Sequence, residues 1–264
     1  MRIQVLVAAM HQEDHSLLQK MNIQSDVIVG NQCDKNSVET FDYNGHKVTY
    51  LNFAERGVGL NRNNALMRAT GDICLFADDD MVYVDNYVQI IKKAFDSYPH
   101  ANALIFNINT VGGDQQRRQN SKVIRIRTFN SLNYGAARIA VRRESIQKSR
   151  ICFSQLFGGG TLYSSGEDSL IIRDMLRNGF KIYAIPETIA TVDQSTSTWF
   201  SGYHEKFFYD KGALMKAMFP RMYVLMNNLY FPLRYKRIAE EKMSNIRKWM
   251  NRGSKAFEIL HPYI

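Results

Sequence analysis

The chain has 264 residues, of which 45% are hydrophobic and 22% charged. This length fits one large domain or a domain with an appendage, and the apolar content is enough for a sizeable core. No apolar run reaches the roughly 18 residues that a membrane-spanning helix needs, so we expect no such helix.

The formal net charge is +9, and it is unevenly distributed. From Leu214 onward ten Lys and Arg oppose three Glu, so this stretch carries +7 of the total. The pattern predicts a basic appendage on a nearly neutral body. Nucleic-acid binding would rest on this charge alone, without a recognition helix or an aromatic RNA-binding motif, so we expect no nucleic-acid partner.

Two features favour a cytoplasmic protein. The three cysteines, Cys33, Cys74 and Cys152, are isolated and have neither disulfide nor zinc spacing. The apolar start, residues 1–9, is too short for the core of a signal peptide and is expected to be a strand.

In the N-terminal half, short apolar or β-branched runs alternate with segments of helical spacing. This alternation predicts an α/β fold with a mostly parallel sheet covered by helices on both faces. The expected strands are 3–9, 27–30, 48–53, 73–77 and 103–107. The expected helices are 16–21, 60–69 and 86–98. Asp85 is placed to cap the third of these helices.

The second half is less regular. Strands are expected at 123–127 and 136–142, and their charged ends indicate an edge or a mixed sheet. A glycine-rich loop at 153–160 leads into a helix at 169–177, and a strand at 180–185 is expected to stop at Pro186. Residues 214–255 are expected to be mainly helical, with breaks near two prolines.

One apolar strand ends abruptly in three aspartates, Asp78, Asp79 and Asp80. Carboxylates at the carboxyl end of a buried strand are typical of ligand sites in open α/β folds. Adjacent acids repel one another unless a cation or a polyphosphate–metal complex lies among them. Residues two apart on an extended chain face the same way, so Asp78 and Asp80 can converge on one ion. A solvated acidic turn is the alternative for this run taken alone.

Two further clusters lie just before helices. In residues 56–64, glycines allow the backbone to approach a ligand, and Arg56 and Arg62 could meet phosphate or a base edge. This signal is weak by itself. Glu167 and Asp168 open a helix, where acids can also simply complement the helix dipole.

In their order and spacing, these segments resemble the family 2 glycosyltransferases of the GT-A fold over roughly residues 1–210. Family members have an N-terminal strand, an acidic or polar pair after the second strand, a helix start with Gly followed by Arg-Asn, an Asp-x-Asp, a glycine-rich loop and a Glu-Asp pair. Here these elements are residues 3–9, 31–32, 59–63, 78–80, 157–160 and 166–168. Residues 173–182 also resemble the family's pattern of an Arg followed by G-y-k-i, with five residues between Arg173 and Gly179.

The resemblance implies a Rossmann-like GT-A domain, which we place over residues 1–212, and the charge and apolar pattern of residues 213–264 predicts a basic, amphipathic helical extension. It implies that Asp80 binds Mn²⁺ or Mg²⁺, with Asp78 as a second ligand or a ribose contact. The ion would bridge the diphosphate of a nucleotide-sugar and stabilise the leaving group.

The resemblance also assigns the remaining roles. Asp168 would be the general base that takes a proton from the acceptor hydroxyl, with Glu167 as the alternative base. The implied donor contacts are Ala8, Asn31, Arg62, Asp78 and Asp79. The implied acceptor contacts are Gly159 and Gly160, and Trp199 is a further candidate because sugars stack on an indole ring.

Three positions leave alternatives open. Asn31 stands where the family often has an aspartate that meets the nucleobase and ribose. The family's histidine after the last core strand is missing, so Asp193 or His204 could complete the metal shell, and His204 could equally be structural. Trp199 lies in a polar loop and could form an acceptor platform or be buried under the C-terminal segment.

The C-terminal segment also has two interpretations. Its methionines and aromatic residues alternate with Arg and Lys, a pattern that suits helices lying on an anionic membrane surface. The alternative is packing against the catalytic domain or a second subunit.

The implied function is metal-dependent, inverting transfer of a sugar from a nucleotide-sugar. The expected donor is a UDP-sugar, as is usual in the family. The acceptor would be a saccharide or a lipid-linked saccharide in surface-polysaccharide assembly, at the inner face of the cell membrane. One alternative is a nucleotide-sugar-binding protein without turnover. Another is a haloacid dehalogenase-type phosphatase, since residues 78–82 fit D-x-D-x-[TV], but that motif belongs on a first strand.

Overall fold

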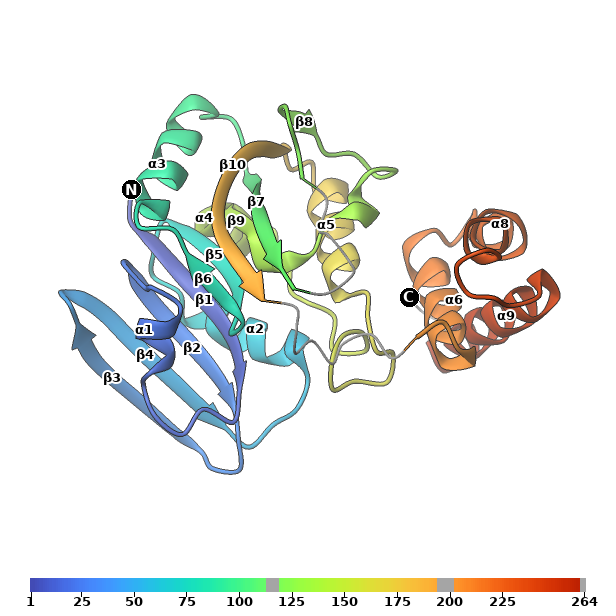
Figure 1. The fold of residues 1–264 in the computed structure, drawn as a ribbon, viewed down its shortest axis with the longest axis horizontal. Coiled ribbons are helices and arrows are strands. Elements are labelled where there is room, and N and C mark those ends of the chain that lie inside the picture. Colours follow the sequence, from blue (N-terminus) through green and yellow to red (C-terminus); the bar gives the residue numbers. More distant parts are fainter. Residues whose placement is uncertain (113–118, 194–201, 262–264) are drawn as a thin grey trace.

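A computed structural model describes residues 1–112, 119–193 and 202–261. A ten-stranded sheet with helices on both faces forms the main body, and the C-terminal helices lie beside it (Figure 1). The strand order is β3-β4-β2-β1-β5-β9-β7-β10-β6, and β8 pairs with β10. The predicted α/β class is confirmed.

The first half of the sheet is a parallel block, apart from its edge strand β3 (Ser37–Tyr43), which runs antiparallel to β4. The parallel strands are β1 (Ile3–Met10), β2 (Asp26–Gln32), β4 (His46–Phe53) and β5 (Ile73–Asp78). Met10 pairs with Gln32 and Ala8 pairs with Asp78, so the carboxyl ends of these strands meet at one edge.

The other half of the sheet is mixed, because β9 (Ile139–Arg142) runs antiparallel to both β5 and β7 (Ala103–Val111). Strand β10 (Ile182–Asp193) is parallel to β7, and β6 (Met81–Tyr83) and β8 (Ile124–Arg125) pair antiparallel with β10. The sheet therefore contains more antiparallel pairing than the alternation of strands and helices indicated.

Several local expectations were wrong. Strand β10 continues through Pro186, where its register with β7 shifts, because a bulge does not need the N–H that proline lacks. Residues Ala136–Arg138 form a 3₁₀ turn rather than the start of a strand. The N-cap of α3 (Tyr87–Ser97) is Asn86 rather than Asp85. Helix α4 (Arg143–Lys148) was not expected.

Two apolar clusters hold the helices against the sheet. Helices α1 (Leu17–Lys20) and α3 cover one face, and α2 (Val58–Arg68), α4 and α5 (Glu167–Arg177) cover the other. Strand β5 alternates between the two clusters, with Leu75 on the first face and Phe76 on the second. Burial on both faces fixes β5, and with it the aspartates at its end.

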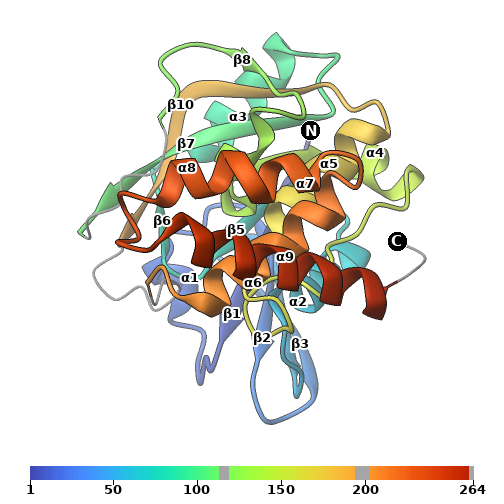
Figure 2. The ribbon, with the colours of Figure 1, turned by 90° about the vertical axis from the view of Figure 1, so that its right-hand side faces the viewer.

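The C-terminal helices form a third apolar cluster together with Phe157, Tyr163 and Leu170. Their elements are α6 (Glu205–Met218), α7 (Tyr223–Leu225), the π-helical turn η3 (Met226–Tyr230), α8 (Phe231–Tyr235) and α9 (Met243–Leu260). Figure 2 shows them lying across one side of the molecule. Helix α6 runs through the boundary expected at residues 212–213. No helix among the described residues is long and apolar enough to cross a membrane.

Candidate active site

A cavity of about 540 Å³ opens at the carboxyl edge of the parallel strands. Its walls come from the ends of β1, β2, β5 and β10, the residues around the start of α2, and the loop 159–164. The residues that line it are Ala8, Met10, Gln32, Arg56, Val58, Asp78, Asp79, Asp80, Gly159, Gly160, Thr161, Ser164 and Asp193.

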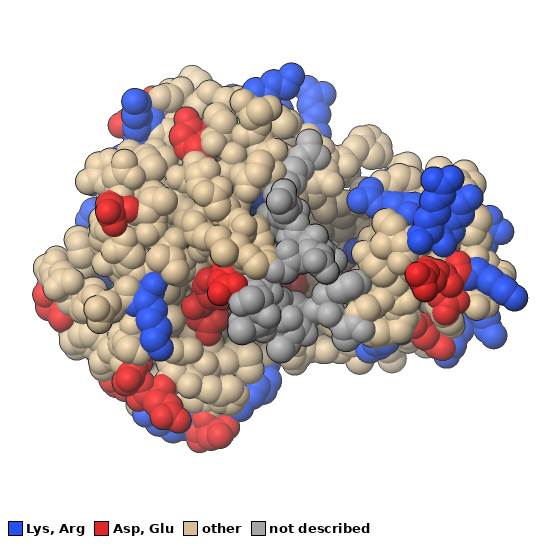
Figure 3. Space-filling view, viewed as in Figure 1, with Lys and Arg blue, Asp and Glu red and all other residues tan. Residues whose placement is uncertain are grey.

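The cavity is strongly acidic. Among its described lining residues, Asp78, Asp79, Asp80 and Asp193 are opposed by Arg56 alone. The Oδ2 atom of Asp79 accepts hydrogen bonds from the Met10 amide and the Gln12 side chain at 3.3 Å each, and burial raises the pKa of this carboxyl. In Figure 3 acidic side chains gather beside the grey atoms near the centre of the molecule. Such a concentration of carboxylates favours a bound cation.

Arg62 connects this acidic edge to the start of α5. Its side chain is only 3% exposed. Its Nη2 atom donates to Asp78 Oδ1 at 2.6 Å, and Nη1 donates to Glu167 Oε1 and Asp168 Oδ1 at 3.1 Å each. Burial lowers the pKa of Arg62, but the three carboxylates outweigh burial and raise it. The guanidinium therefore stays charged and holds carboxylates from β5 and α5 at one point.

The two acids of α5 have different environments. Glu167 is buried, its Oε2 accepts a hydrogen bond from the Gly166 amide at 3.1 Å, and burial together with the Asp168 charge raises the pKa of Glu167. The Asp168 side chain is 31% exposed. A substrate can therefore reach Asp168, whereas Glu167 lies beneath the surface.

The glycine-rich loop interlocks with the start of α2. The Val58 amide donates to the Gly159 carbonyl at 3.0 Å, and the Gly57 amide donates to Gln32 Oε1 at 2.7 Å. Gly158 has φ +112°, and a Cβ there would lie 2.7 Å from Val58 Cγ1 and 2.8 Å from Glu167 Oε2. Only glycine fits at this point. The loop thus carries Gly159 and Gly160 to the cavity wall.

Most of the implied donor, metal and acceptor residues that the structure describes do line the cavity: Ala8, Asp78, Asp79, Asp80, Gly159 and Gly160. Two of the implied donor residues are not among those that line the cavity. Arg62 is buried among carboxylates, as described above. Asn31 is also buried, and its side chain bonds to the backbone of Gln12 at 3.0 and 2.9 Å and to Asn52 at 2.8 Å. Its amide therefore fixes the turn after β1.

The alternatives for a third metal ligand separate in space. Asp193, at the end of β10, lines the cavity. His204 is the N-cap of α6, where its Nδ1 accepts from the Phe207 amide at 3.4 Å, and it is not among the lining residues. Trp199 lies outside the described residues.

The residues at the cavity fit a divalent cation in part. No three His, Cys, Asp or Glu side chains in the described ranges are grouped as a preformed metal site. The lining carboxylates are nevertheless the hard oxygen donors that Mg²⁺ and Mn²⁺ prefer. A Mg²⁺ site commonly uses one or two carboxylates and takes its other ligands from water and substrate phosphates.

Three lining residues were not anticipated as site residues: Met10, Thr161 and Ser164. Ser164 carries the clearest structural signal, because its amide and hydroxyl donate to the buried Asp210 of α6 at 2.9 and 2.7 Å. That link spans 46 residues, so no local pattern could have indicated it.

Comparison with known proteins identifies the fold and the family. The structure is similar to residues 1–349 of S. aureus TarS in complex with UDP-GlcNAc, with a TM-score of 0.63, 16% identity and coverage of 97% of this chain and 92% of that one. It is also similar to the mannosyltransferase PcManGT from Pyrobaculum calidifontis in complex with GDP-Man and Mn²⁺, with a TM-score of 0.50, 15% identity and coverage of 99% and 75%.

At these identities, the two likenesses establish the GT-A-like fold. No curated protein sequence matches the chain significantly. The family described as Glycosyl transferase family 2 matches residues 14–151, more than half of the chain. The chain therefore belongs to glycosyl transferase family 2, and it is a glycosyltransferase.

Proposed function

We propose that this enzyme transfers a sugar from a nucleotide-sugar to a hydroxyl group of a glycan acceptor, with inversion at the anomeric carbon and with a divalent cation. The observation that carries the proposal is the connection between the two halves of the site. Arg62 bonds directly to Asp78 of the acidic cavity and to Asp168 at the start of α5. Arg62 thereby holds the carboxylate of Asp168 at a fixed position relative to the acidic cavity, in which we place the donor.

The nature of the donor is supported by the comparisons. TarS was solved with UDP-GlcNAc, and PcManGT with GDP-Man and Mn²⁺. A cavity with a mainly acidic lining needs a cation before it can accept a diphosphate, because phosphate and carboxylate repel one another. Uracil is the base we expect, as is usual in the family.

In the proposed reaction Asp80, Asp78 and Asp193 would hold Mn²⁺ or Mg²⁺. When bound, the cation supplies Lewis-acid stabilisation of the departing nucleoside diphosphate. Asp168 takes the proton from the acceptor hydroxyl as it attacks the anomeric carbon, and Gly159 and Gly160 line the acceptor side. Glu167, buried beneath Asp168, positions Arg62 and through it the base.

A lipid-linked or surface-polysaccharide glycan at the inner face of the cell membrane is the acceptor we propose. The basic charge of the C-terminal helices supports this setting, since cationic surfaces favour anionic lipids. Figure 3 shows many basic side chains on these helices at the right of the molecule.

A thermal-shift screen of UDP, GDP and their sugars, with and without Mn²⁺, tests donor binding, because stabilisation follows ligand affinity. We expect stabilisation by a uridine nucleotide only with Mn²⁺, and its loss in Asp80→Ala. We expect Asp168→Asn to keep the shift but to lose about 10²–10⁴-fold in turnover. Asp96→Asn, an exposed carboxylate at the end of α3, is the matched control for both variants.

Two results would contradict the proposal. If Asp168→Asn kept more than about a tenth of the wild-type rate, the general base would be another residue. If the wild-type chain bound a nucleotide-sugar but neither transferred nor hydrolysed it, the protein would be a binding protein without turnover.

A further inference from the structure

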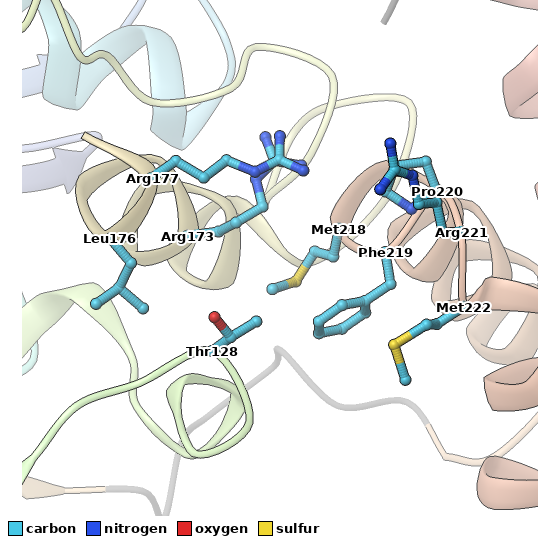
Figure 4. A pocket seen from close by; sticks show the side chains of 9 residues that line it. All are labelled: Thr128, Arg173, Leu176, Arg177, Met218, Phe219, Pro220, Arg221 and Met222. Atoms are coloured by element: carbon cyan, nitrogen blue, oxygen red, sulfur yellow. The ribbon is translucent and has the colours of Figure 1, made fainter. Parts of the chain in front are cut away.

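A second cavity, of about 550 Å³, lies between α5 and the junction of α6 with α7. Figure 4 shows Arg173 and Arg177 projecting from α5, with Arg221 on the opposite wall. Thr128, Met218, Phe219 and Met222 lie below these guanidinium groups in the view. This cavity is distinct from the acidic one and shares no lining residue with it.

The charge of this cavity is positive. Arg173 is partly neutralised, since its Nε and Nη2 atoms donate to Asp174 at 2.8 and 2.7 Å and its Nη1 donates to the Ala217 carbonyl. Arg177 and Arg221 are exposed, and within the described ranges neither forms an ion pair or a hydrogen bond. Guanidinium groups with unused donors are well suited to phosphate, which accepts paired hydrogen bonds.

The cavity also has an apolar wall, to which Met218, Phe219 and Met222 contribute. From Met222 an apolar stripe continues along the helical run, through Leu225, Leu229 and Leu233. These leucines are 52%, 48% and 47% exposed, and their spacing of four residues places them on one helix face. Exposed leucines in a row indicate contact with another apolar group.

We propose that this cavity and the stripe bind a lipid phosphate, with the phosphate on Arg177 and Arg221 and the hydrocarbon chain along Leu225, Leu229 and Leu233. The inference rests on the proposed function and deepens it, because it makes the acceptor a glycan carried on a lipid through phosphate. A phosphate without a hydrocarbon chain would leave the leucine stripe without a contact, and a hydrocarbon chain without a phosphate would leave the two arginines without one.

The cavity is lined by residues of α5, the helix that also carries Asp168. Arg173 follows Asp168 by five residues and Arg177 by nine, which is about 8 and 14 Å along the helix axis. At about 100° per residue, Arg177 lies about 180° around α5 from Asp168, so the saccharide between the lipid and the general base has to extend around the helix as well as along it.

Farnesyl diphosphate, a short prenyl diphosphate, is a suitable probe, and its binding to the full chain can be measured by calorimetry. Inorganic pyrophosphate serves as the head group without the chain. We expect farnesyl diphosphate to bind more tightly than pyrophosphate. Arg177→Ala and Arg221→Ala should each weaken both ligands by about tenfold. The control, Arg237→Ala, removes an equally exposed charge outside the cavity and should change binding less than twofold.

The double variant Leu225→Ser/Leu229→Ser tests the stripe. It should weaken farnesyl diphosphate by about tenfold and leave pyrophosphate unchanged, whereas Ile259→Ser, at another exposed apolar position, should leave both unchanged. Equal binding of the two ligands, with no effect of the leucine variant, would overturn the lipid assignment in favour of a soluble phosphate. No binding of either ligand would overturn the site itself.

The thermal shift by uridine nucleotide and Mn²⁺ is recorded on the same samples. If that shift is present while farnesyl diphosphate fails to bind, only this inference is wrong. If the nucleotide shift is also absent from the wild-type chain, the proposed function is wrong as well.

Discussion

Arg62 is the residue on which the geometry of the site depends. Its guanidinium lies 3% exposed among Asp78, Glu167 and Asp168. Burying a charge is strongly unfavourable unless it is paired and hydrogen-bonded, and the carboxylates of Asp78 and Asp168 together with the carboxyl group of Glu167 meet that requirement here. A lysine could not reproduce this arrangement, because an ammonium is a point charge without the planar fork of arginine. The buried pairing couples the start of α5 to the end of β5.

The raised pKa of Glu167 leads to a pH-dependent stability. Burial and the neighbouring Asp168 raise the pKa of Glu167 from 4.5 to about 8. The folded state then binds a proton at Glu167 that the unfolded state releases at lower pH. Stability from this group is therefore fully present below pH 4.5 and is lost progressively as the pH rises toward 8.

We expect Glu167→Gln to remove this dependence, because the amide is neutral at every pH. Urea unfolding at pH 5, 6, 7 and 8 measures it. The unfolding free energy of the wild type should fall relative to that of Glu167→Gln as the pH rises. If the unfolding free energies of the two proteins changed with pH in parallel from pH 5 to 8, Glu167 would be ionised over that whole range, and its raised pKa would be wrong. Glu144→Gln, at an exposed acid of α4, is the control.

The candidate site residues were foreseen unequally. The aspartates after β5 and the Glu-Asp pair could be found in sequence, because each is a short motif at the end of a strand or the start of a helix. The partners of Arg62 could not, since Glu167 and Asp168 lie 105 and 106 residues away. The string Asp78–Val82 also fitted a phosphatase, and only family membership decides between the two classes.

At the scale of elements, the glycine-rich loop and the start of α2 form one interlocked unit. Gly57, Gly158 and Gly160 all have positive φ, at 120°, 112° and 78°. A Cβ at Gly160 would lie 3.1 Å from the Gly57 amide, so the two backbones approach closely. This unit forms one wall of the acidic cavity, and its shape depends on the absence of side chains.

We expect Gly158→Ala to destabilise the fold and to impair turnover, while Gly45→Ala only destabilises it. Both positions have positive φ, which costs an alanine about 1 kcal/mol. Gly158 adds contacts at 2.7 Å and 2.8 Å, whereas a Cβ at Gly45 has nothing within 4 Å. The overpacking should cost a further 1–3 kcal/mol, roughly. Chemical denaturation measures the stability and a sugar-transfer assay measures the turnover, and equal losses in the two variants would refute the packing argument.

Element boundaries were foreseen where an apolar period is strong and missed where tertiary structure decides. The buried strands β1, β2, β4 and β5 each contain an apolar run. Strand β3 was missed because its residues alternate between half-buried and exposed and are largely polar. Strand β10 passes Pro186 only because of a register shift against β7, which depends on a strand far away in sequence.

At the scale of the whole molecule, the C-terminal helices are joined to the active site. Asp210 of α6 is 2% exposed and accepts hydrogen bonds from Ser164, which lines the acidic cavity. A Cβ at Gly166, which precedes Glu167, would lie 2.6 Å from Leu214 of α6. The division of the chain at residue 212 stays a prediction. These contacts indicate that α6 belongs structurally to the catalytic part.

This connection leads to an expectation for Asp210→Asn. The substitution removes the charge that Ser164 and Lys206 both contact and leaves the shape of the side chain nearly unchanged. We expect a loss of about 2 kcal/mol in unfolding free energy, the typical value of hydrogen bonds to a charged group. Hydrogen exchange of residues 157–166 should rise in the same variant, because the loop loses its contact with α6.

Glu258→Gln is the matched control for this experiment. It also removes a carboxylate paired with a lysine, since Glu258 contacts Lys216 at 2.8 Å, but that pair lies within the C-terminal helices. Glu258 is 56% exposed, so its loss should cost less than about 1 kcal/mol and leave exchange in the loop unchanged. If Asp210→Asn lost stability without faster exchange in residues 157–166, α6 would stabilise the fold without holding the active-site loop. Faster exchange limited to that loop would mean that the helices which carry the basic charge also set the shape of the cavity.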